Sequence, residues 1–200
     1  MTERIWNYHM NDMEQKKIKI VTLFGESGSG KDTIQRWIVS NIPNTKGIVS
    51  CTTRPKRDNE TEGIDYHYLT NEQFAEDVLN GNMLEATDFN NWFYGTRISE
   101  LDENKINIGV FNIAGIECLQ QDSRLEVIPI YIWVDNKTRL LRVLNREKFP
   151  DCHEICRRFL ADEKDFDDME DKIPNFISIY NGDIKEKTEQ ILTELFNSIQ

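Results

Sequence analysis

The 200-residue sequence lacks the features of a membrane protein, a secreted protein or a nucleic-acid-binding surface. Its longest apolar run, residues 127–134, contains a proline and is far too short to span a bilayer. Residues 1–17 are polar and charged, unlike a secretory leader. Lys and Arg number 24 against 35 Asp and Glu, and this net charge of -11 is opposite to that of most nucleic-acid binders. We therefore expect a cytoplasmic protein that binds neither nucleic acid nor membrane and that holds any anion with local basic groups.

Cysteine is also scarce, because the chain has four cysteines and none of them forms a Cys-x-x-Cys pair. Cys152 and Cys156 could share one face of a helix, but a zinc site needs about four ligands. We therefore expect reduced structural thiols rather than disulfides or a metal site.

The hydrophobic pattern predicts one α/β domain. Short apolar runs typical of buried strands lie at residues 18–24, 47–50, 106–113, 127–134 and 176–180, and segments with helical spacing follow several of them. Strands that alternate with helices predict a parallel sheet with helices on both faces. The segment from about residue 50 to 97 fits this alternation least, so we expect a smaller inserted subdomain there.

Capping signals predict where several helices begin and end. Thr70 and Gln73 form a capping box, and Gly81 is a helix stop. Asp151 is a predicted cap for a helix through residue 166, and Asp183 with Glu186 opens a closing helix. Residues 83–89 and 92–96 are expected to be extended pieces around a turn.

The segment GESGSGKDT, residues 25–33, nearly matches the phosphate-loop pattern G-x-x-x-x-G-K-[ST] and lies between a predicted strand and a predicted helix. Three glycines let successive N–H groups point at one anion, and the helix adds its positive N-terminus. Lys31 supplies a full charge to the terminal phosphates. The predicted ATP site comprises Gly25, Glu26, Ser27, Gly28, Ser29, Gly30, Lys31, Asp32 and Thr33.

Asp32 departs from this pattern, because it stands where a Ser or Thr hydroxyl normally reaches Mg²⁺. Three interpretations are open: Asp32 repels ATP, points away in a first helical turn that favours negative charge, or holds the ion itself. We favour the third, since Mg²⁺ prefers hard oxygen ligands. Thr33 adds a hydroxyl, but neighbouring helical residues point about 100° apart and do not reach one ion.

A second predicted anion site lies in SCTTRPKRDNETEGIDYHY, residues 50–68. Two arginines and two hydroxyls in one short span suit a phosphate monoester, because guanidinium forks match phosphate oxygens. LEATDFNNWFYGT follows at residues 84–96. The alternatives are a solvated basic loop and, for Tyr94, a core aromatic. The candidate residues of the two segments are Ser50, Arg54, Arg57, Tyr66, Glu85, Tyr94 and Thr96.

With these segments the sequence resembles the guanylate kinase family, whose pattern is S-x-T-T-R-x-x-R-x-G-E-x-x-G-x-D-Y-x-F followed by Y-Y-G-[ST]. The spacing is kept from residue 50 to 96, and the resemblance runs from Ile18 to the C-terminus. It implies a P-loop NTPase-type α/β fold with a nucleoside monophosphate-binding region at about 48–97 and a helical lid at about 136–165. Residues 18–200 would form this domain, and residues 1–17 would be an extension.

The resemblance also implies roles for single residues. Glu85 and Thr96 would read guanine, since a carboxylate accepts from both N1–H and N2–H, whereas adenine has an acceptor at N1. Arginines of the lid would close over the triphosphate, and the choice between Arg157 and Arg158 stays open. Asn181 would lie near the adenine of ATP. The acceptor phosphate would be held by Ser50, Arg54, Arg57, Tyr66 and Tyr94, and the catalytic set would be Lys31, Arg54, Arg142, Arg146 and Arg158.

Other departures bear on selectivity. Asn59 replaces a glycine, and Val110 and Asn112 stand where the family pattern D-h-D-h-Q-G has two aspartates. Asn112 is still expected to face the base, but its amide has both a donor and an acceptor, so guanine selection is relaxed or altered. The lost carboxylates add a reason for Asp32 to serve the metal.

The sequence therefore predicts a monophosphate kinase, monomeric or homodimeric, that converts ATP and GMP or dGMP to ADP and GDP or dGDP with Mg²⁺. One alternative is a deoxynucleotide kinase of different or broader base range, because the loop's Lys-Asp-Thr ending resembles some phage enzymes. The other is an inactive guanylate kinase-like module that binds proteins, although the complete Gly-Ser-Gly-Lys speaks against it.

Overall fold

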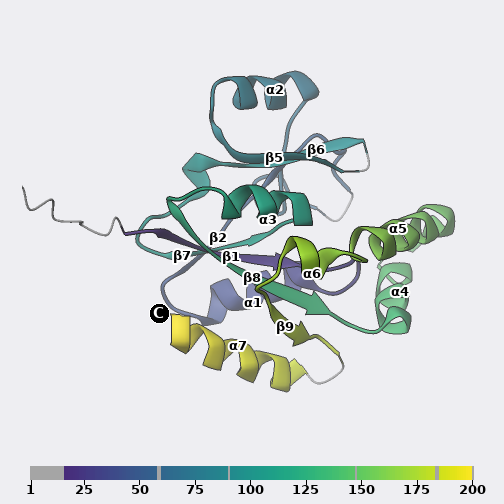
Figure 1. Cartoon of the computed structure of the whole chain (residues 1–200). Helices are drawn as coiled ribbons and strands as arrows, with labels where there is room; N and C mark the ends of the chain where they lie inside the picture. The colour runs from purple at the N-terminus through teal and green to yellow at the C-terminus, as the bar shows by residue number, and fades with distance from the viewer. Residues whose placement is uncertain (1–15, 58–59, 90, 147, 183–184, 200) are drawn as a thin grey trace, which may run out of the picture.

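The central sheet has five parallel strands in the order β2-β7-β1-β8-β9 (Figure 1). A computed structural model of the chain describes residues 16–57, 60–89, 91–146, 148–182 and 185–199. The strands are β1 (Ile18–Phe24), β2 (Thr45–Gly47), β7 (Ile106–Val110), β8 (Leu125–Trp133) and β9 (Ile177–Tyr180). Within the described ranges, no helix is long and apolar enough to cross a bilayer.

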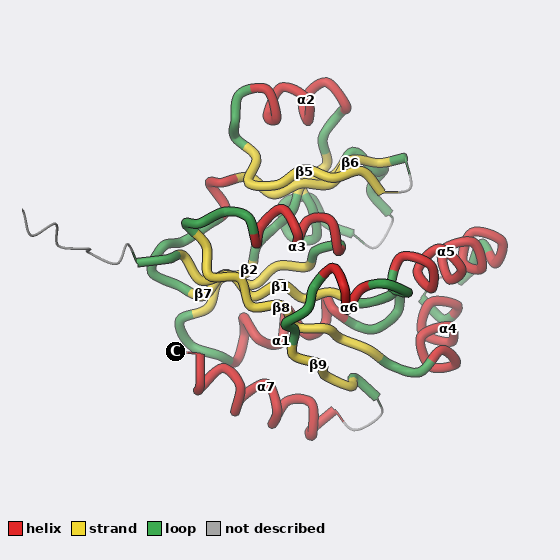
Figure 2. The backbone as a smooth tube through the Cα atoms, viewed as in Figure 1, coloured by secondary structure: helices red, strands yellow, loops and turns green. Residues whose placement is uncertain are grey.

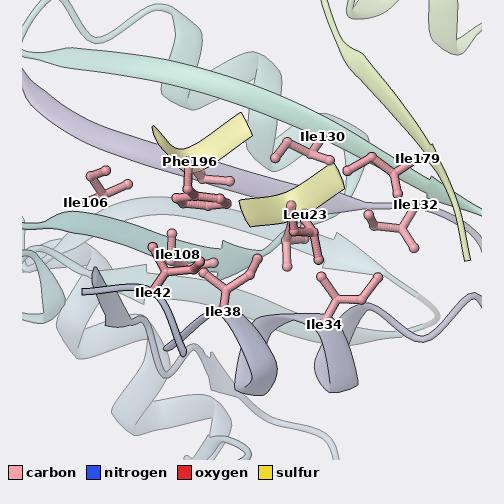
Figure 3. Packing of buried hydrophobic residues seen from close by; sticks show 12 residues of the cluster. Leu23, Ile34, Ile38, Ile42, Ile106, Ile108, Ile130, Ile132, Ile179 and Phe196 are labelled. Atoms are coloured by element: carbon pink, nitrogen blue, oxygen red, sulfur yellow. The ribbon is translucent and has the colours of Figure 1, made fainter. Parts of the chain in front are cut away.

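Helices cover both faces of this sheet, which confirms the predicted α/β architecture (Figure 2). Helices α1 (Lys31–Asn41) and α7 (Lys185–Ile199) pack on one face, where Ile38 and Phe196 meet Leu23 in a fully buried cluster (Figure 3). Helices α3 (Ile113–Gln120) and α6 (Met169–Lys172) pack on the other face. Burial of these apolar side chains, at about 25 cal/mol per Å², supplies the main driving force for the fold.

A second sheet lies beyond α3 and has the strand order β4-β3-β6-β5 (Figure 1). Its strands are β3 (Cys51–Thr52), β4 (His67–Tyr68), β5 (Met83–Phe89) and β6 (Trp92–Arg97). Helix α2 (Asn71–Leu79) packs on it through the buried Phe74, and the short η1 (Ile98–Glu100) returns the chain toward the central sheet. The segment that breaks the strand–helix alternation therefore forms its own sheet.

Helices α4 (Asn136–Leu144) and α5 (Cys152–Asp165) project beside the carboxyl end of β8 (Figure 1). Asp135 caps α4 by accepting from the Thr138 N–H at 2.9 Å. Asp151 caps α5 by accepting from the Glu154 N–H at 3.1 Å, as the sequence predicts. The predicted capping box of α2 is also present in full.

Four predicted strands have different bounds. β8 begins at 125 and ends at 133 rather than spanning 127–134, and β9 begins at 177 rather than 176. The strand expected at 47–50 lies at 45–47, because after Ile48 bonds to Ile108 the chain leaves the central sheet to begin β3. The strand expected at 106–113 ends at Val110, because Asn112 caps α3 by accepting from the Gly115 N–H at 2.7 Å. The predicted cap at Asp183 lies outside the described residues.

Candidate active site

The loop of residues 25–30, which we call the glycine loop, joins β1 to α1 and is tightly enclosed. Gly25, Gly28 and Gly30 have φ values of 146, 85 and 95°, which other residues rarely adopt. A Cβ at Gly28 would lie 2.6 Å from the Arg139 carbonyl oxygen, and one at Gly25 would collide with the carbonyl oxygen of Ile132. The glycines therefore let the loop curl against β8 and α4.

Lys31 lies across the glycine loop. Its Nζ donates to the carbonyl oxygens of Gly25 at 2.7 Å and Glu26 at 3.1 Å. Burial lowers the pKa of Lys31, while the carboxylates of Asp32, Asp162 and Glu26 oppose that shift. A partly buried cation above a curled loop is an arrangement that an anion would stabilise.

The glycine loop opens into a cavity of about 470 Å³ between the central sheet, the second sheet and helices α3, α4 and α5. The structure brings many of the sequence-predicted residues together around it. Those that line the cavity are Gly25, Ser27, Gly28, Lys31, Asp32, Ser50, Arg57, Tyr66, Glu85, Tyr94, Asn112, Arg146 and Arg158. The other predicted residues, which are absent from its lining, are Glu26, Ser29, Gly30, Thr33, Arg54, Thr96, Arg142 and Asn181.

Positive charge converges on this cavity from separate parts of the chain. Arg57 follows β3, whereas Arg146 and Arg158 come from the region of α4 and α5. Burial lowers the pKa of Arg57, and the charges of Arg54, Arg158 and Arg146 lower it further. Like charges repel, so a phosphate between them would relieve the repulsion.

Glu60 organises the basic loop, and sequence reasoning missed it. Its carboxylate accepts from Arg54 Nη2 at 2.8 Å, from the Arg57 backbone N–H at 2.9 Å and from the Tyr68 hydroxyl at 2.8 Å. Burial raises the pKa of Glu60, but these hydrogen bonds outweigh it and lower the pKa to about 2. The family pattern has a glutamate directly after the position of Asn59, and this match could have identified Glu60 from the sequence.

Arg54 is 6% exposed and lies behind the cavity wall, with its guanidinium 5.5 Å from the Tyr66 ring centre. Arg142 is likewise engaged with the protein, because it donates to the carbonyl oxygens of Ser29 at 3.4 Å and Asn181 at 2.9 Å. Asn181 Nδ2 also donates to the Ser29 carbonyl at 2.6 Å. The side chains of Arg54, Arg142 and Asn181 therefore bond to other parts of the protein and fix the loops that surround the cavity.

Of the two candidate lid arginines, Arg158 lines the cavity and Arg157 does not. Both donate to the Glu154 carboxylate at 2.7 Å, three and four positions away on α5. Glu154 thus orients both guanidinium groups, and their one-position offset on the helix turns Arg158 toward the cavity.

Glu85 also lines the cavity, is 8% exposed and has no ion pair within the described part of the chain. Burial raises its pKa to about 7, although a hydrogen bond from Thr96 opposes the shift. Its carboxyl group is close to Gly115, where an added Cβ would lie 3.3 Å from Oε2. A carboxyl held in this way suits a ligand that brings N–H donors.

Asn112 lies beside Glu85 with a fixed orientation. Its Oδ1 accepts from the Gly115 N–H at 2.7 Å, and its Nδ2 donates to the Thr87 hydroxyl at 2.8 Å. Because a backbone N–H requires an acceptor, the carbonyl of the Asn112 amide must face α3. The sequence did not single out Thr87 as the partner of this amide.

Asp32 is exposed on the first turn of α1, lines the cavity and makes no hydrogen bond to any residue that the structure describes. Burial raises the pKa of Tyr66, and the nearby charge of Asp32 adds to that effect. The described ranges hold no group of three or more His, Cys, Asp or Glu that could bind a metal ion. One free carboxylate fits an Mg²⁺ ion that takes its other ligands from phosphates and water.

The α/β fold agrees with the comparisons with known proteins. The guanylate kinase family profile matches residues 17–198, and the chain belongs to that family. A solved guanylate kinase from Anaplasma phagocytophilum has a similar fold, with a TM-score of 0.65 and 23% identity over 92% of this chain and 88% of its own.

Curated relatives match shorter stretches. A guanylate kinase from Helicobacter hepaticus is 30% identical over 133 residues, which are 64% of this chain and 66% of the relative. One from Salinibacter ruber is 40% identical over 42% of this chain and 45% of the relative. The human Disks large homolog 3 is 29% identical over 86% of this chain and 20% of its own length. The matched stretches thus span less than two thirds of these relatives' lengths.

The raised pKa of Glu85 makes stability depend on pH. Because the folded-state pKa of about 7 exceeds the usual 4.5, the folded state binds this proton more tightly than the unfolded state. The group therefore lowers the free energy of unfolding as pH rises from about 4.5 to 7, by about 3 kcal/mol. Glu85→Gln should remove this part of the pH dependence, as measured by chemical denaturation at pH 5 and 7.5.

Glu76→Gln is the matched control, because Glu76 is exposed on α2. It should keep the pH dependence of the unaltered protein. If the free energy of unfolding changes equally with pH in all three proteins, folding does not raise the pKa of Glu85 and the prediction is wrong.

Proposed function

We propose that this chain is a nucleoside monophosphate kinase that transfers the terminal phosphoryl group of ATP to GMP or dGMP. The observation that carries the proposal is that cationic side chains from separate segments of the chain line one cavity. Lys31 and the glycine loop form one wall, Arg57 belongs to another, and Arg146 and Arg158 also line the space. Membership of the guanylate kinase family supports the same reaction.

The proposed chemistry needs no strong base, because the acceptor oxygen of a monophosphate is already anionic. The protein contributes positioning and charge stabilisation. The glycine-loop amides and Lys31 hold the donor phosphates, and Arg57 with Ser50, Tyr66 and Tyr94 holds the acceptor phosphate. Arg146 and Arg158 place positive charge beside the transferring group.

Three further predicted residues, Arg54, Arg142 and Asn181, lie outside the cavity lining and support the loops that form it. Arg54 fixes the basic loop through Glu60, and Arg142 with Asn181 fixes the glycine loop through Ser29. The sequence also predicts direct phosphate contact for Arg54 and Arg142, which would require their guanidinium groups to leave these protein partners. We further propose that residues 48–97 are the acceptor-binding region and that residues 136–165 are a lid, which excludes water on closure.

The base end of the cavity explains the proposed preference for guanine. Glu85, supported by Thr96, accepts from the N1–H and N2–H of the base, and these donors replace the hydration that burial removes. Asn112 presents its amide from α3 at the same end. An adenine would leave Glu85 without donors, which is the kind of loss that gives large discrimination.

ATP is the proposed donor, and Mg²⁺ is the proposed metal. When bound, the ion would offset the charge of the donor phosphates, and Asp32 would hold it directly or through a water molecule. A kinase that draws on the nucleotide pool of the cell would work in the cytoplasm, which is the compartment we propose.

A coupled assay of ADP release over a panel of monophosphates tests the proposed reaction. GMP and dGMP should be turned over, and AMP, CMP and dTMP should be at least about tenfold poorer substrates. Glu85→Gln should reduce the rate with GMP by at least about tenfold, because it presents a donor to the guanine N–H groups. Comparable rates for all bases would favour the kinase of broader range.

ATP binding, measured by calorimetry, separates this proposal from the non-catalytic module. An intact glycine loop with Lys31 in place predicts binding, whereas the module should bind no ATP. Absence of both ATP binding and ADP release would reject the kinase.

The metal role of Asp32 gives a separate prediction. Asp32→Ala should raise the Mg²⁺ concentration needed for half-maximal rate, whereas Asp32→Ser should keep substantial activity because a hydroxyl can also serve the ion. The rate is measured as a function of Mg²⁺ at saturating nucleotide. If Asp32→Ala binds ATP more tightly and turns over faster at every Mg²⁺ level, repulsion is the correct account.

A further inference from the structure

The lid helices place a buried carboxylate on the glycine loop. Asp162 of α5 is 4% exposed, and its Oδ2 accepts from the backbone N–H of Ser27 at 2.7 Å. Ser27 is 135 positions away in the chain and belongs to the loop proposed to hold the donor phosphates. One of the loop amides is therefore already bonded to an anion that the protein itself supplies.

The same oxygen meets a second donor. Arg139 of α4 is 1% exposed, and its Nη1 lies 3.3 Å from Asp162 Oδ2. A backbone amide and a guanidinium that converge on one anionic oxygen are the groups that also bind a phosphate oxygen. Asp162 thus occupies a position with the chemistry of a phosphate site.

Arg139 has donor capacity that the protein leaves unused. Its Nε donates to Asn136 Oδ1 at 2.9 Å, and its guanidinium lies 3.8 Å from the centre of the Phe159 ring. Its Nη2 is buried and has no hydrogen-bond partner among the described residues, and it lies 3.7 Å from the Glu163 carboxylate. A buried unpaired donor is costly, and a group with more acceptor oxygens would satisfy it.

We infer that Arg139 is a further binding residue for the terminal phosphates of the donor nucleotide, and that Asp162 holds this place until the triphosphate displaces it. The inference rests on the proposed function, because it needs a triphosphate at the glycine loop. A terminal phosphate has more oxygens and more charge than a carboxylate, so it can bond to the Ser27 amide and to both Nη groups of Arg139.

The exchange has a consequence for affinity. ATP binds only the fraction of molecules in which Asp162 has left the glycine loop, so the apparent dissociation constant exceeds the intrinsic one. Asp162 then acts as an internal competitor of the donor. GMP, which is proposed to bind at the opposite wall, does not compete with it.

Calorimetry with ATP tests this inference on Asp162→Asn, which keeps the shape of the side chain but removes its charge. The variant should bind ATP about tenfold more tightly, because a neutral amide is a weaker competitor for the Ser27 N–H and Arg139. Its affinity for GMP should stay within about twofold of the unaltered protein.

Glu163→Gln is the matched control, because it removes the same charge from the next position of α5 and also lies near Arg139. Its carboxylate forms no hydrogen bond or ion pair with the glycine loop in the described residues, so the ATP affinity of this variant should stay within about twofold. If Asp162→Asn binds ATP no more tightly than this control, the carboxylate only ties α4 to α5 and the inference is wrong.

A crystal structure of the unaltered protein with a non-hydrolysable ATP analogue supplies a second test that needs no variant to fold. Asp162 should lie beyond hydrogen-bond distance of the Ser27 N–H, and Arg139 should contact a phosphate oxygen. Retention of the Asp162–Ser27 hydrogen bond with the triphosphate bound would overturn the inference.

GMP turnover on the same samples separates the two proposals. If the unaltered protein transfers no phosphoryl group but Asp162→Asn gains ATP affinity, the proposed function fails and this inference stands. If GMP is phosphorylated and Asp162→Asn gains no ATP affinity, the inference fails and the proposed function stands.

Discussion

Repulsion between like charges is the constraint on which the arrangement of this site depends. One cavity is lined by four positively charged side chains, which repel one another: Lys31, Arg57, Arg146 and Arg158. Buried or oriented carboxylates make this possible: Glu60 lies behind Arg57, Glu154 orients Arg158, and Asp162 reduces the cost of a charged Lys31. Nearby carboxylates therefore stabilise this cluster of positive side chains, and the chain that carries it has a net charge of -11.

The fold brings these charges to the cavity from separate segments. The central sheet carries the glycine loop at the end of β1, and the second sheet carries Glu85, Thr96 and Tyr94. Helix α3 packs between the sheets and brings Asn112 beside Glu85, while the region of α4 and α5 brings Arg146 and Arg158 to the cavity (Figure 1). Each wall comes from a different segment, so relative motion of the segments would change the distance between donor and acceptor.

Local patterns were readable from the sequence, and contacts between distant residues were not. The capping box at Thr70, the Asp151 cap and the glycine loop depend on neighbours in the chain, and each was predicted. Arg139 reads as an ordinary charged residue of a polar helix, yet it is 1% exposed because α5 supplies Phe159 and Asp162. The hydrogen bond from Ser27 to Asp162 spans 135 positions, and no local pattern signals it.

The central claim is that two anion sites face each other across one cavity, and a bisubstrate ligand measures this most directly. Adenosine and guanosine joined by a chain of phosphates should bind at least about a hundredfold more tightly than ATP or GMP alone, because one molecule fills both sites. Arg57→Gln should lose most of this gain, whereas Lys56→Gln, an exposed neighbour outside the cavity, should keep it. A bisubstrate affinity no greater than that of ATP alone, or equal losses in both variants, would contradict the account.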